Sequence, residues 1–189
     1  GDYFKDKILG SNHTYTDFYY DLFKNLRSQI SNVFECGIGS NNLNIESNMG
    51  IHGKPGASLR MWKDFFPQAS IYGGDIDKEI LFKEERIETF YVDQRNSEQI
   101  KSMWSKINKK FDIIIDDGLH FFDANINFFE NSFDNLKNGG IYIIEDIRIK
   151  EQKLFYNYFE NNKNNVKHVS LNSKAISGST NLVLIEKSE

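Results

Sequence analysis

The sequence predicts an α/β fold in which helices cover both faces of a mostly parallel β-sheet. Short apolar segments alternate with segments whose apolar residues recur every three or four positions, as they do along one face of a helix. The run Phe111–Ile115 is almost wholly apolar, which is typical of a central parallel strand buried on both faces. Acidic residues follow several of these strands, at the edge where open parallel sheets bind ligands.

The first half of the chain supplies a leading helix, three strands and one long loop. In order, we predict a helix over 14–29, a strand over 33–35, a loop over 37–56, a helix over 57–66, a strand over 69–75, a helix over 78–87 and a strand over 88–92. Pro67 ends the second helix, because proline disfavours helical geometry in the residue before it. The loop is rich in glycine and asparagine and exceeds the usual connection length, which favours a functional role.

The second half supplies three further helices and four strands. In order, we predict a helix capped by Ser97, a strand over 111–115, a helix over 123–137, a strand over 141–146, a helix over 151–161, and strands over 166–171 and 180–186. Glu98 suits the positive end of the first of these helices, and Asn138 to Gly140 would end the second. The sheet therefore has seven predicted strands, with the last one antiparallel.

Length and composition exclude several classes of protein. The chain has 189 residues, for which we expect one domain, with a helical lead-in over 1–30 and a core over 31–189. The net charge of -4 supplies no basic surface for nucleic acid, and no apolar run approaches the ~18 residues of a membrane span. Cys36 is the single cysteine and cannot form an internal disulfide. We therefore expect a cytoplasmic protein without nucleic-acid or membrane partners.

Acidic residues at three successive strand ends predict an adenosine site. Glu35 precedes the glycine turn that begins at Gly37, where its carboxylate would suit a cationic amine. Asp75 ends the second strand and would accept hydrogen bonds from ribose hydroxyls, while Asp93 follows the third and suits an adenine amine. Each acid alone is equally well explained as a cap of the next helix. Their recurrence favours a ligand site.

A dinucleotide-binding dehydrogenase is the rival interpretation of the glycine turn. Asn42 replaces the third glycine of its Gly-x-Gly-x-x-Gly fingerprint. Asp75 lies 38 residues beyond Gly37, whereas the fingerprint places its acidic residue about 20 residues on. An acid directly before the glycines is also disfavoured beside a pyrophosphate. These departures favour a different adenosine-containing ligand.

Four motifs and one strand ending together resemble a known family. The motifs are Glu35-x-Gly37-x-Gly39, GASLRMWKDFFP over 56–67, IDDGLH over 115–120 and GGIYIIED over 139–146, and the strand ending is the Gly-Asp at 74–75. Over about residues 10–150 the chain resembles the class I S-adenosylmethionine (SAM)-dependent methyltransferases that O-methylate macrolide sugars, the mycinamicin and tylosin type. The resemblance implies a Rossmann-like fold, SAM as methyl donor and a magnesium-dependent site. Leu119 stands where that family usually has serine, and the family's separate N-terminal auxiliary domain is absent from this sequence.

Two loops after neighbouring strands carry the residues predicted to perform chemistry. Asp117 and His120 follow one strand, and Glu145 with Asp146 end the next. Three converging carboxylates repel one another unless a cation neutralises them, and Mg²⁺ prefers such oxygen ligands. The resemblance implies the same roles, with Asp117, Glu145 and Asp146 as metal ligands and His120 as the base. A single Asp-Asp-Gly is more often a turn, and a lone histidine is more often structural, so the prediction depends on both loops.

The predicted cofactor-binding set contains five further residues. Asp116 is placed at the methionine end of SAM, and Tyr15 lies in a segment that resembles the family's motif before the core. Ser58, Leu59 and Ile76 complete the set, the first two in the GASLRMW segment and the third directly after Asp75.

These observations lead to one leading hypothesis and two rivals. The leading hypothesis is a Mg²⁺-dependent O-methyltransferase that acts on a hydroxyl of a sugar or sugar nucleotide, in glycan or secondary-metabolite biosynthesis. The rivals are a metal-independent N- or O-methyltransferase of another small molecule, and a non-catalytic SAM-binding subunit. The expected partner is the small-molecule acceptor, and assembly as a homo-oligomer stays open.

Overall fold

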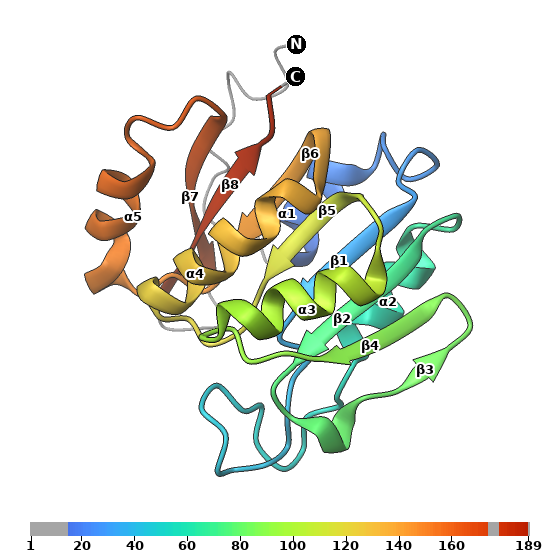
Figure 1. The fold of residues 1–189 in the computed structure, drawn as a ribbon. Coiled ribbons are helices and arrows are strands. Elements are labelled where there is room, and N and C mark those ends of the chain that lie inside the picture. The colour runs from blue at the N-terminus through green and yellow to red at the C-terminus, as the bar shows by residue number, and fades with distance from the viewer. Residues whose placement is uncertain (1–14, 174–177, 189) are drawn as a thin grey trace.

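An eight-stranded sheet forms the centre of the protein (Figure 1). The structure is a computed structural model that describes residues 15–173 and 178–188. The strands are β1 Asn32–Cys36, β2 Ser70–Asp75, β3 Lys83–Glu84, β4 Ile87–Tyr91, β5 Phe111–Asp116, β6 Leu136–Ile144, β7 Asn165–Ser173 and β8 Gly178–Glu186. They lie in the order β3-β4-β2-β1-β5-β6-β8-β7. Strands β4, β2, β1, β5 and β6 are parallel, and β8 is antiparallel to β6, which confirms the predicted α/β class and the antiparallel last strand.

Helices cover both faces of the sheet, as predicted. They are α1 Tyr15–Phe23, α2 Ala57–Phe65, α3 Ser97–Ile107, α4 Phe122–Ser132 and α5 Gln152–Phe159, with short 3-10 turns at Lys78–Ile80, Phe133–Asn135 and Ile149–Glu151. Buried residues of α1 and α2 pack against one face, and those of α3, α4 and α5 pack against the other. In Figure 1, α3 and α4 lie in front of the sheet. The sheet is thus shielded from water on both sides, as its apolar strands require.

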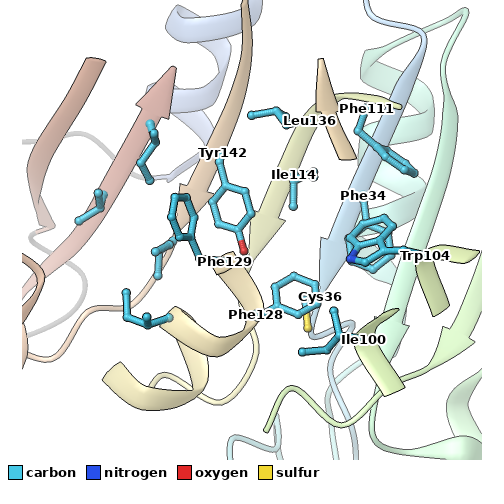
Figure 2. Close-up of a cluster of buried hydrophobic side chains, with 14 of the residues drawn as sticks. Phe34, Cys36, Ile100, Trp104, Phe111, Ile114, Phe128, Phe129, Leu136 and Tyr142 are labelled. Atoms are coloured by element: carbon cyan, nitrogen blue, oxygen red, sulfur yellow. The ribbon is translucent and has the colours of Figure 1, made fainter. Parts of the chain in front are cut away.

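Alternation along the strands divides the apolar side chains between two cores. Ile113 packs on the α1 and α2 face, while its neighbour Ile114 packs on the α3 to α5 face, because successive side chains of a strand point in opposite directions. Figure 2 shows the second core, in which Phe34 lies beside Trp104 with ring centroids 4.5 Å apart. Tyr142 is fully buried in the same core. These contacts fix the strand ends that carry the polar residues.

The predicted helix over 78–87 is wrong, and its correction adds the eighth strand. Only Lys78–Ile80 is helical, and β3 then forms a hairpin with β4. The Phe82 N–H donates to the hydroxyl of Thr89 at 2.6 Å, and the Thr89 N–H donates to the Phe82 carbonyl at 3.1 Å. Arg86 takes the positive φ of 61° that turns the chain. These hydrogen bonds satisfy backbone groups that would otherwise have been paired within a helix. Because β3 is an additional strand, the predicted count of seven strands is one too low.

Two predicted helix ends also differ from the structure. The leading helix ends at Phe23, after which the Leu26 and Gln29 N–H groups donate to carbonyls three residues back, so the chain continues in tight turns. The helix predicted to 137 ends at Ser132. Residues 136–140 instead belong to β6, where the Gly139 N–H donates to the Lys187 carbonyl.

Asn96, not Ser97, caps α3. The Asn96 side chain accepts from the Gln99 N–H at 3.1 Å, whereas the Ser97 hydroxyl donates to Asn127 on α4. Glu98 lies in the first turn, as predicted. None of the helices within the described ranges is long and apolar enough to cross a membrane.

The loop over 37–56 has no regular secondary structure, as predicted, and is held by its own polar groups. The Met49 N–H donates to the Ser40 carbonyl at 2.8 Å. The amide of Asn41 donates to the carbonyls of Gly50 and Gly53 at 2.8 and 3.0 Å. In Figure 1 this loop lies beyond the arrowheads of β1 and β2. It therefore encloses space at the carboxyl edge of the sheet.

Candidate functional site

A cavity of about 610 Å³ lies at the carboxyl ends of β1, β2, β4 and β5. Its position agrees with the general placement of ligands in open parallel sheets. Residues of the 37–56 loop form part of its wall. Eight of the predicted site residues also line it: Gly37, Ser58, Asp75, Ile76, Asp93, Asp117, His120 and Asp146.

Gly37 lets two loops of the cavity wall approach each other closely. Its φ is +84°, and a Cβ atom there would lie 2.1 Å from the carbonyl oxygen of Asp117. The Asp117 N–H in turn donates to the Cys36 carbonyl at 2.9 Å. Only glycine fits at this crossing. The glycine turn after β1 and the acidic turn after β5 are therefore in direct backbone contact.

Asp75 and Asp93 line the cavity and are held by backbone N–H groups. The two carboxylate oxygens of Asp75 accept from the N–H groups of Ile38 and Asp77, each at 2.9 Å. Burial raises the pKa of Asp75, and these bonds oppose that rise. Asp93 accepts from the Arg95 N–H at 2.9 Å. Both acids are thus fixed in place without help from a ligand.

The side chains of Glu35 and Leu59 point into the protein and do not line the cavity. Glu35 is 3% exposed and accepts hydrogen bonds from the hydroxyl of Ser58 and, at 2.5 Å, from Nε1 of Trp62. Burial raises the pKa of Glu35 to about 7. Leu59 is fully buried in the core beneath β2, where it packs close to Gly73. Neither side chain reaches the cofactor space predicted for it in this arrangement.

Asp116 is also fully buried, on the α4 side of the sheet. Its carboxylate accepts from the side chains of Gln94 and Asn125 at 2.5 and 2.9 Å, and from the Gly118 N–H at 3.3 Å. Burial raises the pKa of Asp116 to about 7. The structure therefore places this acid behind the acidic turn, where it contacts protein donors.

Asp117, His120 and Asp146 converge at the cavity wall. One ligand atom from each side chain lies within 4.8 Å of the others, and His120 Nε2 is 3.9 Å from Asp117 Oδ1. The convergence follows from topology, because β5 and β6 are paired so that Asp116 lies opposite Ile144. Residues that follow these two strands must therefore meet. The predicted gathering of two separated loops is present.

Glu145 lies beside this group, although it is not part of it. Its carboxylate accepts a hydrogen bond from the hydroxyl of Tyr19. Burial raises the pKa of Glu145 to about 8. Burial and the neighbouring Glu145 also raise the pKa of Asp117 well above its usual range. The acidic groups here therefore resist ionisation unless positive charge is supplied.

The His120 backbone has an uncommon conformation. The residue has a positive φ of 58°, as Asp146 does at 48°. Burial lowers the pKa of His120, which favours the neutral ring, and its Nδ1 is buried without a hydrogen-bond partner. A neutral imidazole with an unused nitrogen is able to accept a proton or hold a ligand.

Two tyrosines of α1 contact the acidic loop after β6. The Tyr15 hydroxyl donates to Asp146 Oδ1 at 2.8 Å and accepts from the Asp146 N–H at 3.2 Å. Tyr15 therefore lies on the acidic side of the site. Sequence reasoning placed Tyr19 within the leading helix without singling it out, and so missed its hydrogen bond to Glu145. The available signal was that a buried tyrosine hydroxyl usually finds a polar partner.

Gln94 was also missed. It is 6% exposed, lines the cavity and directly follows the predicted Asp93. Its adjacency to Asp93 was the sequence signal that could have identified it.

Comparisons with known proteins place the chain among sugar O-methyltransferases by similarity. It is 37% identical over 145 residues to mycinamicin VI 2''-O-methyltransferase of Micromonospora griseorubida, an alignment that covers 77% of this chain and 34% of that protein. It is 33% identical over 136 residues to 8-demethyl-8-alpha-L-rhamnosyl tetracenomycin-C 2'-O-methyltransferase of Streptomyces olivaceus, covering 72% and 34%. The chain thus spans about a third of the length of these relatives. No protein-family model matches the chain.

A solved structure agrees with these relatives. The MycE methyltransferase from the mycinamycin biosynthetic pathway, in complex with Mg and SAH, matches with a TM-score of 0.68 and 28% identity. The match covers 96% of this chain and 51% of that one. The resemblance expected from the four motifs is confirmed, and the chain has the class I methyltransferase fold.

Proposed function

The chain is similar in sequence and fold to the macrolide-sugar O-methyltransferases, and we propose that it is a Mg²⁺-dependent, SAM-dependent O-methyltransferase of a sugar hydroxyl. One observation carries the proposal. Asp117, His120 and Asp146 converge to within 4.8 Å at the wall of the cavity that Asp75 and Asp93 also line. Metal-binding and proton-accepting groups therefore lie next to a space with acids suited to adenosine.

The residues of the cavity fit an adenosine-containing donor. Gly37 and Gly39 both have positive φ at the turn after β1 and line the cavity, so the backbone of this turn forms part of the cavity wall. Asp75 and Asp93 offer carboxylates to ribose hydroxyls and to the adenine amine, and Ile76 supplies an apolar wall. We therefore assign this half of the cavity to SAM.

The acidic residues fit a hard divalent cation. The carboxylates of Asp117 and Asp146 each place an oxygen within 4.8 Å of the other and of a His120 nitrogen, and Glu145 lies beside them. Mg²⁺ prefers oxygen ligands and keeps open positions for other oxygens. Burial, together with neighbouring carboxylates, raises the pKa values of Asp117 and Glu145, and a cation would favour their charged forms. We propose Asp117, Glu145 and Asp146 as its ligands.

His120 is then left to manage the proton. When bound, the donor supplies a methyl group activated by its sulfonium, and the cation lowers the pKa of a hydroxyl that it holds. As the acceptor oxygen is methylated and the donor leaves as its thioether, His120 would take the hydroxyl proton. Burial lowers the pKa of His120, which favours the neutral ring that such a base requires.

The acceptor class follows from the relatives. Two of them are named for methylation of sugar hydroxyls on secondary metabolites. We therefore propose a sugar-bearing small molecule as acceptor. Neighbouring sugar hydroxyls suit a metal site because two oxygens chelate one cation.

Metal removal tests the proposal against its rivals. Release of S-adenosylhomocysteine (SAH) is followed with SAM, Mg²⁺ and a panel of glycosylated small molecules and nucleotide sugars. We expect turnover to stop in EDTA and to return with Mg²⁺. Turnover that persists in EDTA would support the metal-independent methyltransferase instead. A protein that binds SAH tightly and methylates no acceptor with any metal would support the non-catalytic subunit.

A further inference from the structure

We propose that Gln94 is a positioning residue that fixes the turn from Asp117 to His120. The inference rests on the proposed function, because it concerns how the metal-binding and proton-accepting groups are held. Gln94 lies in the connection between β4 and α3, far in sequence from the turn that it contacts.

Both ends of the Gln94 amide are used on this turn. Its Nε2 donates to Asp116 Oδ1 at 2.5 Å, and its Oε1 accepts from the Leu119 N–H at 2.8 Å. The turn also fits closely around it, since a Cβ at Gly118 would lie 2.4 Å from Gln94 Oε1. The amide therefore bridges the residues immediately before and within the segment that carries Asp117 and His120.

The bridge is anchored in the folded core. Gln94 is 6% exposed, and its backbone carbonyl accepts from the side chain of Asn127 on α4 at 2.8 Å. Asp116 is fully buried and accepts from Asn125 on the same helix at 2.9 Å. Side chains of α4 thus hydrogen-bond to both Gln94 and Asp116, the residues joined by the 2.5 Å bond. Through its bond to Leu119, Gln94 then restrains the turn.

A second contact restrains the same residue, Leu119. The Ser47 hydroxyl donates to the Leu119 carbonyl at 3.1 Å, so both polar groups of Leu119 are engaged. The next residue, His120, has a φ of 58°, a region that residues other than glycine rarely adopt. A strained conformation persists only where its surroundings determine it. The Gln94 bond to Leu119 supplies such a restraint directly beside His120.

Gln94→Met tests this inference, because methionine is similar in length and offers neither hydrogen bond. The first readout is hydrogen exchange of the Leu119 amide, which we expect to accelerate about 10-fold or more. The second is Mn²⁺ affinity, measured by electron paramagnetic resonance without donor or acceptor, which we expect to fall about 10-fold. We expect SAH affinity to change less than about 3-fold, and kcat to fall more than KM rises. Gln29→Met, at an exposed glutamine on another part of the chain, is the matched control and should alter none of these.

A polarity swap keeps the test informative if Gln94→Met folds poorly. Gln94→Glu removes the donor and places a second carboxylate against Asp116, so Mn²⁺ affinity and kcat should fall. Adding Asp116→Asn restores one hydrogen bond with donor and acceptor exchanged. We expect the double variant to recover at least about 3-fold of the loss in both readouts, because the bridge reforms.

Three outcomes would overturn the inference. They are an unchanged Leu119 exchange rate, an SAH affinity that falls as much as the Mn²⁺ affinity, and a double variant no better than Gln94→Glu. Failure of the proposed function looks different, because wild-type protein would then show no Mg²⁺-dependent turnover at all.

Discussion

The two halves of the cavity satisfy their acidic groups in opposite ways. On the donor side, Asp75 receives backbone N–H groups at both carboxylate oxygens. On the acidic side, burial raises the pKa values of Asp117 and Glu145, and neighbouring carboxylates add to the rise, while Glu145 and Asp146 accept hydrogen bonds from tyrosines. His120 there keeps a nitrogen without a partner. The acid of the first half is held by backbone donors, whereas acids of the second lie close enough together to repel one another.

This difference indicates where each ligand contributes to the fold. A neutral or cationic donor adds hydrogen bonds to acids that are already fixed. A divalent cation instead removes a repulsion that the folded chain carries without it. Changes on the acidic side should therefore alter metal binding and its effect on stability together, and changes on the donor side should alter donor affinity without altering metal binding.

The largest expected effect is that of Asp117→Asn. It removes a charge from the acidic group while keeping the shape of the side chain. We expect kcat to fall about 10³-fold or more and Mn²⁺ affinity to fall about 100-fold, because a proposed ligand is lost. Isothermal titration with SAH is the control and should show little change. A variant that retains Mg²⁺-dependent turnover would remove Asp117 from the metal site.

For Asp75→Asn we expect a smaller effect, which falls on SAH affinity and not on Mn²⁺ affinity. The neutral amide weakens the acceptor offered to ribose hydroxyls and disturbs the bonds from Ile38 and Asp77. We expect SAH affinity to fall about 10-fold, which corresponds to about 1.4 kcal/mol. Mn²⁺ affinity should stay within about 3-fold of wild type. Equal losses in both affinities would erase the distinction between the two halves.

The pH dependence of stability gives the smallest expected signal. The pKa of Glu145 is raised from 4.5 to about 8 in the folded state. Its contribution to stability is therefore fully present below pH about 4.5 and is lost as the pH rises through about 8. Mg²⁺ should offset that loss. The Mg²⁺ concentration is fixed at about 100 times the dissociation constant measured at pH 8. At this concentration Mg²⁺ should raise Tm by roughly 5–10 °C near pH 8, and by less near pH 6.

Thermal unfolding by circular dichroism checks this pattern. Asp117→Asn should lose most of the Mg²⁺ effect, and Asp75→Asn should keep it. A Mg²⁺ effect of the same size at both pH values would contradict the link to buried carboxyl groups.

The features that sequence predicted well are those with a strong local pattern. The apolar run of β5 and the acids at the ends of β1, β2 and β6 were sufficient for the fold class and the position of the cavity. The helix predicted over 78–87 failed because its residues contain no strong break, while the hairpin is held by the Phe82–Thr89 bond across its turn and by pairing of β4 with β2. A local pattern does not contain the pairing with β2.

Side-chain direction at the strand ends was the other feature that sequence left open. Glu35 pairs with Ile115 and faces α2, while Asp116 pairs with Cys36 and faces α4. A carboxylate at a strand end reaches the cavity only if its position in the strand alternation allows it. The motifs singled out both Asp116 and Asp117. Only the structure shows that Asp116 is buried and that Asp117 lines the cavity.

The most direct test of the central claim is anomalous diffraction from crystals grown with Mn²⁺ and SAH. We predict one peak bound by carboxylate oxygens of both Asp117 and Asp146, at about 2.1 Å, with the SAH sulfur facing it across the cavity. A peak elsewhere, or an Asp117 side chain turned away from Asp146 with no ion between them, would contradict the account.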